Sequence, residues 1–315
     1  MHILVTGGCG YVGTLLVQSL LEQEINVTVV DAMWFGNFLN DHPRLTQVKE
    51  DILNIDSIPM KNVDCIIHLA NIANDPSGDL DSKLTWEVNV LATKLLVEKA
   101  ISYGVKQFIY ASSGSVYGVK SEENVTEDLC LVPLTDYNKT KMISERVLLS
   151  YTKNIVVQCI RPATVCGYSP RMRLDLSVNM LTMQALTKQK ITVFGGDQTR
   201  PNIHIQDLVR VYHHFISTGD KYPGIFNAGF ENFSILEIAQ TISNRIPSDI
   251  IVTESNDPRS YRLNSDKLLN TGFCPQYGVS NSIEEIIAAF ENGVLKDEDK
   301  YYNLRMMKTF VGSQN

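Results

Sequence analysis

A chain of 315 residues with 44% hydrophobic and 20% charged residues has the composition of an ordinary globular protein and can bury a sizeable core in one or two domains. Its formal net charge of -7 argues against a nucleic acid as the main partner, because nucleic-acid binding usually needs a basic surface. No apolar run approaches the roughly 18 residues of a membrane-spanning helix. The opening residues MHILVTGG lack the basic segment and cleavage site of a signal peptide, so we expect a cytoplasmic protein. The six cysteines form no Cys-x-x-Cys pair and no zinc-like cluster with histidine, and we therefore expect no metal site.

Along the first half of the chain, apolar runs alternate with segments of helical period, which is typical of β-α-β units. The runs HILVT, CIIHL and FIYAS are continuously apolar, as in parallel strands that are covered on both faces. The pattern predicts strands at 3–6, 26–31, 45–49, 64–69, 107–112 and 155–161, and helices at 11–22, 82–103 and 136–151. We therefore expect residues 1–165 to form an NAD-binding domain with a Rossmann-like doubly wound parallel sheet.

The second half of the chain is less regular. The segment RPATVCGYSPRMRLD carries turn residues and clustered arginines, and a helix follows it up to about Lys188. Further strands are expected at 192–194, 224–228 and 250–253, and further helices at 205–218, 234–245 and 282–292. We interpret residues 166–315 as mainly a smaller α/β substrate-binding lobe, which could be interleaved with the first domain. From Lys296 onward the chain is charged and weakly periodic, and its role is not evident.

The segment TGGCGYVG lies between the first expected strand and the first expected helix, the place of a dinucleotide-binding turn. Gly7 would permit the tight turn, Gly10 would let the backbone approach a diphosphate, and Gly13 would let the helix pack closely on the sheet. The diphosphate would then meet the helix N-terminus, at Tyr11 and Val12.

An acidic residue, Asp31, ends the second expected strand, 18 residues after Gly13. Its carboxylate can accept a hydrogen bond from a ribose hydroxyl but would repel a 2′-phosphate, and no arginine follows it directly. NAD is therefore favoured over NADP. Asp51 and Ile52 follow the third expected strand and are candidates for contact with the adenine, although an aspartate at a strand end is often only a turn residue.

Candidate catalytic residues follow the fifth expected strand. Ser113 and Ser115 stand at the carboxyl edge of the sheet, where doubly wound folds bind their ligands. Tyr137 and Lys141 are four residues apart on an expected helix and so share one face. We expect the ammonium of Lys141 to lower the pKa of the Tyr137 phenol, which would make that phenol a usable acid and base. Ser113 would hold the substrate oxygen that exchanges its proton with Tyr137.

The chain resembles the extended short-chain dehydrogenase/reductase family, specifically its NAD-dependent nucleotide-sugar epimerases and dehydratases. The resemblance covers nearly the whole sequence. It rests on the TGGCGYVG turn, HLA at 68–70, Asn89, the SSGSVYG strand end, Tyr137 with Lys141, Arg161-Pro162, Asn179 in its SVN segment, VFGGDQTRPNIHIQD at 193–207 and NAG at 227–229.

This resemblance implies tightly held NAD and hydride transfer at a sugar carbon, usually C4, of a nucleotide-diphosphate sugar. It adds cofactor contacts at Leu69, Ala70 and Asn89, and substrate contacts at Asn74, Asn179, Arg200, Asp257 and Arg259. Paired charge-assisted hydrogen bonds from arginines suit a diphosphate. Arg171 and Arg173 could add to that clamp or could form a solvated surface pair.

Departures from the family pattern reduce the number of reactions that the chain is expected to catalyse. Where the 4,6-dehydratases carry an Asp-Glu pair, this chain has Gly114-Ser115, so dehydration is not expected. The arginine that uridine-sugar 4-epimerases usually carry before the equivalent of Asp257 is missing, and Arg259 could replace it from the other side. The segment SPRMRLDLSVN is similar to a bacterial subset that acts on modified sugars or heptoses, including GDP-heptose C4 dehydrogenases.

Several interpretations stay open at this point. The protein could be an epimerase, or a C4 dehydrogenase or reductase without epimerisation. It could also be a non-catalytic NAD-binding module, or an oxidoreductase for an apolar alcohol. Expected helices 82–103 and 136–151 match those that pair into a four-helix bundle in this family, so we expect a homodimer, although packing on the chain's own sheet explains much of their apolar pattern.

Overall fold

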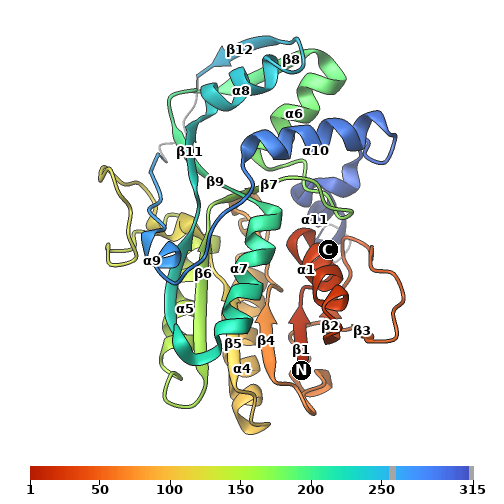
Figure 1. Cartoon of the computed structure of the whole chain (residues 1–315), viewed down its shortest axis with the longest axis vertical. Helices are drawn as coiled ribbons and strands as arrows, with labels where there is room; N and C mark the ends of the chain where they lie inside the picture. The colour runs from red at the N-terminus through yellow and green to blue at the C-terminus, as the bar shows by residue number, and fades with distance from the viewer. Residues whose placement is uncertain (255–259, 312–315) are drawn as a thin grey trace.

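The computed structural model describes residues 1–254 and 260–311 (Figure 1). Within these residues the chain forms a seven-stranded parallel sheet in the order β10-β6-β5-β4-β1-β2-β3, which we call the main sheet. The predicted doubly wound parallel sheet is therefore confirmed. Its strands are β1 (His2–Thr6), β2 (Asn26–Asp31), β3 (Leu45–Lys49), β4 (Cys65–His68), β5 (Gln107–Ala111), β6 (Val156–Pro162) and β10 (Gly224–Ala228).

Helices cover both faces of the main sheet. Because side chains alternate along a strand, Ile3 and Val5 of β1 join one apolar cluster while Leu4 joins the other. On the first face lie α1 (Tyr11–Glu22) and α7 (Ile205–Thr218). On the second face lie α3 (Ser82–Trp86), α4 (Ala92–Ser102) and α5 (Asp136–Leu149). Both faces of the main sheet are covered by packed apolar side chains, which explains the continuous apolar runs of the strands.

The strand order reverses direction at β1. That strand pairs with β2 on one side and with β4 on the other, so that Thr6 lies opposite Val30 and His68. In sheets of this kind the connections diverge at the reversal and leave a crevice at the carboxyl ends of the strands. The fold therefore places the glycine turn at the edge of such a crevice.

A smaller lobe stands over the carboxyl edge of the main sheet (Figure 1). One of its sheets has the order β11-β9-β7, and the other pairs β12 with β8. The strands are β7 (Thr164–Cys166), β8 (Lys190–Phe194), β9 (Thr199–His204), β11 (Glu231–Ser234) and β12 (Asp249–Thr253), and the helices are α6 (Ser177–Lys188), α8 (Ile235–Ser243) and α10 (Val279–Glu291). Ile191, Ile238 and Ile283 belong to the separate apolar core of this lobe.

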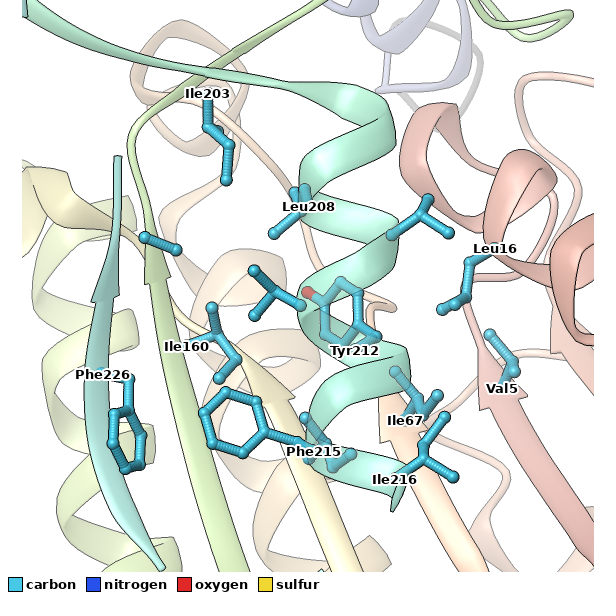
Figure 2. Packing of buried hydrophobic residues seen from close by; sticks show 14 of the residues in the cluster. Val5, Leu16, Ile67, Ile160, Ile203, Leu208, Tyr212, Phe215, Ile216 and Phe226 are labelled. Atoms are coloured by element: carbon cyan, nitrogen blue, oxygen red, sulfur yellow. The ribbon is translucent and has the colours of Figure 1, made fainter. Parts of the chain in front are cut away.

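The chain returns from the smaller lobe to the main sheet. Strand β10 pairs in parallel with β6, and α7 packs beside α1. Figure 2 shows Tyr212 and Phe215 of α7 among residues of the main sheet. The ring of Phe215 lies 4.8 Å from that of Phe226 on β10. Residues 205–228 thus complete the first face of the main sheet.

Several elements differ from the sequence expectation. The helix expected at 82–103 is divided into α3 and α4 by a π-helical turn, η2 (Glu87–Leu91). The charged segment near the end of the chain forms α11 (Asn303–Val311), in which Met307 is buried. Strands β7, β9 and β11 of the smaller lobe are not expected from the sequence. Nor are the short elements α2 (Asp75–Gly78), α9 (Asp266–Leu269), η1 (Ile55–Ser57), η3 (Gly114–Tyr117), η4 (Gly219–Lys221) and η5 (Asp299–Tyr301). Among the described residues, no helix combines the length and the apolar character needed to cross a membrane.

Candidate active site

A cavity of about 700 Å³ opens at the carboxyl edge of the main sheet and extends under the smaller lobe. Its walls contain most of the residues that the sequence singled out. They are Gly7, Gly10, Tyr11, Val12, Gly13, Asp31, Asp51, Ile52, Leu69, Ala70, Asn74, Ser113, Ser115, Tyr137, Lys141 and Arg200. The volume is within the range of ligand-binding pockets. Residues from both halves of the chain therefore converge on one site.

The glycine turn after β1 has the close contacts that its residues were expected to allow. Gly7 has a φ of +73°, and a Cβ there would lie 2.6 Å from the backbone nitrogen of Ala70. A Cβ on Gly13 would lie 2.4 Å from the carbonyl oxygen of Gly7. Gly10 caps α1 without a side-chain hydrogen bond, and the first turn of α1 carries no acidic residue. The helix N-terminus therefore presents its amide groups and partial positive charge to the cavity.

The carboxylate of Asp31 lies beside this turn. It accepts hydrogen bonds from the backbone nitrogens of Cys9, at 2.9 Å, and Met33, at 2.7 Å. Burial raises the pKa of Asp31, and these two hydrogen bonds act in the opposite direction. A fixed carboxylate at the end of β2 is well placed to accept hydrogen bonds from a ribose.

The three predicted catalytic residues come together where β5 ends and α5 begins. The hydroxyl of Ser113 lies near the phenol of Tyr137 and lowers the pKa of that phenol. The Ser113 hydroxyl also lies 2.8 Å from that of Ser115. The amine of Lys141 donates to the carbonyl oxygen of Ala111 at 2.5 Å and lies 5.8 Å from the centre of the Tyr137 ring. The geometry thus joins a phenol, two hydroxyls and an amine at one wall of the cavity.

The pKa of Tyr137 differs from the sequence expectation. Burial raises it to about 12, while the Ser113 hydroxyl lowers it, Asp75 raises it and Arg173 lowers it. Burial also lowers the pKa of Lys141 to about 7. The expected acidification of Tyr137 by Lys141 is therefore wrong for this arrangement, because both side chains are removed from water and each is favoured in its neutral form.

A buried charge network supports this wall from behind. Arg161 donates to the two oxygens of Glu145 at 2.9 and 2.7 Å and to the hydroxyl of Tyr117 at 2.7 Å. Ser112 donates to the same carboxylate at 2.5 Å. The network fixes β5, β6 and α5 relative to one another, and with them Ser113 and Tyr137. The guanidinium of Arg161 does not line the cavity. Its role in this network explains why Arg161-Pro162 is part of the family pattern.

Two predicted contact residues have their amides engaged inside the protein. Asn89 is fully buried and bonds with the backbone of Ile72 and the hydroxyl of Thr140. Asn179 accepts from the backbone nitrogen of Gly167 and donates to the hydroxyl of Tyr11. Neither is among the described residues that line the cavity. Asn89 and Asn179 therefore support the walls of the cavity, and their contacts with a ligand stay predictions. Asp257 and Arg259 lie outside the described residues.

On the substrate side, Asn74 donates to Asp175 at 2.9 Å, and Asp175 accepts two hydrogen bonds of 2.9 Å from Arg173. Arg171 and Arg173 are both buried in the cavity wall, so the alternative of a solvated surface pair is wrong. Arg200 on β9 contributes a third guanidinium to the lining. These arginines explain how a chain with a net charge of -7 can offer a positive site.

Sequence reasoning missed part of the lining. Trp34 and Phe35 after β2, Asp175, and Asn303 and Leu304 of α11 all face the cavity. For α11 a signal was present, because the apolar residues of LRMMKTFV recur at helical spacing. For Asp175 no periodic pattern exists, since its role depends on the fold of a loop.

A dinucleotide turn at the reversal point of a parallel sheet, next to a Ser/Tyr/Lys group, defines an oxidoreductase-type nucleotide site. The sequence pattern described as the NAD dependent epimerase/dehydratase family matches residues 3–229. This chain belongs to that family and is an NAD-dependent enzyme.

Similar proteins agree in fold and cofactor. The chain is 31% identical over 259 residues to a Bacillus subtilis protein named uncharacterized UDP-glucose epimerase YtcB, with 78% of this chain and 82% of that protein covered. It matches the structure of MoeE5 in complex with UDP-glucuronic acid and NAD at 26% identity and a TM-score of 0.83, covering 93% of this chain and 100% of the other. It also matches UDP-glucuronic acid 4-epimerase from Bacillus cereus, in complex with UDP-glucuronic acid and NAD, at 27% identity and a TM-score of 0.80, covering 93% and 99% of the chains.

Proposed function

We propose that this protein is a nucleotide-sugar 4-epimerase that keeps NAD bound through its catalytic cycle. The observation that carries the proposal is the convergence of Ser113, Tyr137 and Lys141 on the cavity that begins at the glycine turn. The similarity to epimerases of UDP-glucose and UDP-glucuronic acid supports a nucleotide-diphosphate sugar as the substrate.

The residues present fit NAD. Gly7 and Gly13 let the turn pack tightly against its own backbone and against Ala70, the first turn of α1 offers free amides, and Asp31 offers an acceptor for ribose. When bound, the dinucleotide would supply the acceptor and donor of a hydride.

Tyr137 acts as the base and acid at the C4 hydroxyl of the sugar. As C4 is oxidised, the hydroxyl proton passes to the phenolic oxygen of Tyr137 and the hydride leaves from carbon. Ser113 holds the same oxygen. Lys141, whose amine lies 5.8 Å from the centre of the Tyr137 ring, would bind the ribose of the nicotinamide half. Return of the hydride to the opposite face of C4, and of the proton from Tyr137 to the oxygen on C4, gives the inverted sugar, so the cycle is redox-neutral and needs no outside oxidant.

The arginine-lined wall would hold the nucleotide diphosphate. Arg200 faces the cavity, and we propose that Asp257 and Arg259 contribute ribose and diphosphate contacts from outside the described residues. Dehydration is disfavoured because Ser115 stands where dehydratases carry an acid, and its hydroxyl is engaged by Asn138 at 2.5 Å.

The test is to incubate the purified protein with UDP-glucose or UDP-glucuronic acid without added cofactor and to follow the sugar by NMR. We expect the C4-inverted product from wild type and none from Tyr137→Phe. Accumulation of a C4-oxidised sugar only when NAD is supplied would instead identify a C4 dehydrogenase. Unchanged turnover in Tyr137→Phe would exclude this mechanism, and unchanged substrate affinity in Arg200→Ala would point to an uncharged alcohol as the substrate.

We also propose that the protein is a cytoplasmic homodimer in which α4 and α5 pair with their copies. The two helices lie side by side, and Leu91 beside them is 46% exposed. The resemblance to a family in which these two helices pair into a four-helix bundle supports such an interface.

A further inference from the structure

Three buried arginines lie in or behind the cavity wall, and they differ in how their charge is balanced. Arg161 pairs with Glu145, and Arg173 pairs with Asp175. Within residues 1–254 and 260–311, no carboxylate forms an ion pair with Arg171, which is only 2% exposed. The carboxylates of Asp175 and Asp31 act on its charge without pairing with it. A buried charge without a paired counter-charge is costly, so an anion bound in the cavity would stabilise Arg171.

The contacts of Arg171 fix its orientation without neutralising it. It donates to the backbone oxygen of Met172 at 3.0 Å and to the side-chain oxygen of Asn303 at 2.6 Å, and its guanidinium carbon lies 4.4 Å from the centre of the Phe35 ring. Its Nε is buried and has no hydrogen-bond partner among the described residues. Burial, followed by repulsion from Arg173, lowers the pKa of Arg171 to about 10. The guanidinium lines the cavity with its hydrogen-bonding capacity only partly used.

The position of Arg171 identifies the part of the cavity that it serves. Phe35, whose ring lies 4.4 Å from the guanidinium carbon, comes four residues after Asp31. Ser169, two residues before Arg171, donates to the backbone oxygen of Tyr11 at 2.8 Å. Asp31 marks the expected ribose of the adenosine half, and Tyr11 begins α1, where a diphosphate would meet the backbone amides. These contacts place Arg171 at the adenosine and diphosphate part of the cavity.

We propose that Arg171 binds the diphosphate of NAD and that Asn303 of α11 positions its guanidinium for this contact. The C-terminal helix thereby contributes to cofactor retention, although it lies far along the chain from the glycine turn. The proposal rests on the dinucleotide site described above and does not depend on the sugar or on the reaction.

The test compares Arg171→Gln with Arg305→Gln, a matched loss of charge on the exposed side of α11. Binding of ADP-ribose and of adenosine is measured by calorimetry, because both carry the adenosine and only the first carries the diphosphate. We expect Arg171→Gln to weaken ADP-ribose binding about 10- to 100-fold, as for hydrogen bonds between charged groups, and to leave adenosine binding unchanged. Arg305→Gln should change neither.

Two further readouts separate ligand binding from support of the fold. Without ligand, Arg171→Gln should melt at the same temperature as wild type or higher, because an unpaired buried charge is removed. The affinity of wild type for ADP-ribose should fall with salt more steeply than that of the variant. Asn303→Ala, which keeps the charge but frees it to move, should show a smaller loss of ADP-ribose affinity.

Three outcomes would overturn the proposal. An equal loss of adenosine and ADP-ribose binding, together with a lower melting temperature without ligand, would make Arg171 a purely structural residue. Unchanged ADP-ribose affinity would show that the guanidinium does not reach the diphosphate. A loss confined to NADP, with NAD and ADP-ribose unaffected, would place it at the 2′-position of the ribose instead.

Discussion

At the scale of single residues, the acidity of Tyr137 depends on groups that lie outside the Ser/Tyr/Lys motif. After burial and the Ser113 hydroxyl, the charges of Asp75 and Arg173 act on the phenol in opposite directions. Arg173 is itself held by Asp175. The Tyr137 phenol is therefore tuned by the loop after β4 and by the segment before α6, which are joined by the hydrogen bond from Asn74 to Asp175.

Replacing Tyr137 by phenylalanine should remove proton transfer and keep the site. We expect kcat to fall about 10²- to 10⁴-fold, the usual contribution of a general acid and base. NAD affinity, measured by calorimetry, should stay close to that of wild type. The exposed Tyr103 offers a control, because Tyr103→Phe should leave both quantities unchanged.

Asp75→Asn should shift the pH dependence of sugar oxidation. The Asp75 carboxylate raises the pKa of Tyr137, so its removal lowers that pKa, and the phenolate needed as a base forms at lower pH. The rising limb of the rate against pH, measured in a single turnover, should therefore move to lower pH. Asp79→Asn, in the same loop, should leave the limb in place, and a shift of Asp75→Asn to higher pH would contradict the assignment.

At the scale of elements, the Glu145–Arg161 pair joins α5 to β6 within the core. Glu145→Ala leaves the Arg161 charge buried and unpaired, and we expect it to lower the free energy of unfolding by about 3–5 kcal/mol. Lys94→Ala, which breaks the exposed Lys94–Glu98 pair of α4 and keeps the hydrogen bond from Tyr151 to Glu98, should lower the free energy of unfolding far less. Urea denaturation of both variants measures the two losses in free energy of unfolding. Equal losses would show that the buried pair contributes no more to stability than the exposed one.

The parts of the site that sequence could predict are those with local patterns. The glycine turn and the helical spacing of Tyr137 and Lys141 each depend on neighbouring residues, and the structure places them in one cavity. The contact between Arg171 and Asn303 spans 132 residues, and no periodicity reveals it. Asn89 shows the reverse case, in which a family motif predicts a ligand contact but the fold uses the amide inside the protein.

At the scale of the whole molecule, the proposed dimer can be tested on its surface. Leu91→Glu places a charge on the exposed residue beside α4 and should convert a dimer into a monomer in sedimentation velocity. Val294→Glu, at a residue that is 61% exposed in the second half of the chain, should leave the dimer intact. A wild-type protein that sediments as a monomer at all concentrations would rule out the assembly. The division of the chain near residue 165 also stays a prediction.

The place of β10 has a consequence for how the protein is made. Its partner β6 ends at Pro162, yet β10 begins only at Gly224, after most strands of the other lobe have been synthesised. While the chain is being synthesised, the edge of β6 therefore stays unpaired until residue 228 has left the ribosome. Unpaired strand edges favour aggregation. Ribosome-stalled products that stop at residue 165 should be bound by chaperones and cleaved by protease, whereas products that extend beyond residue 229 should resist both.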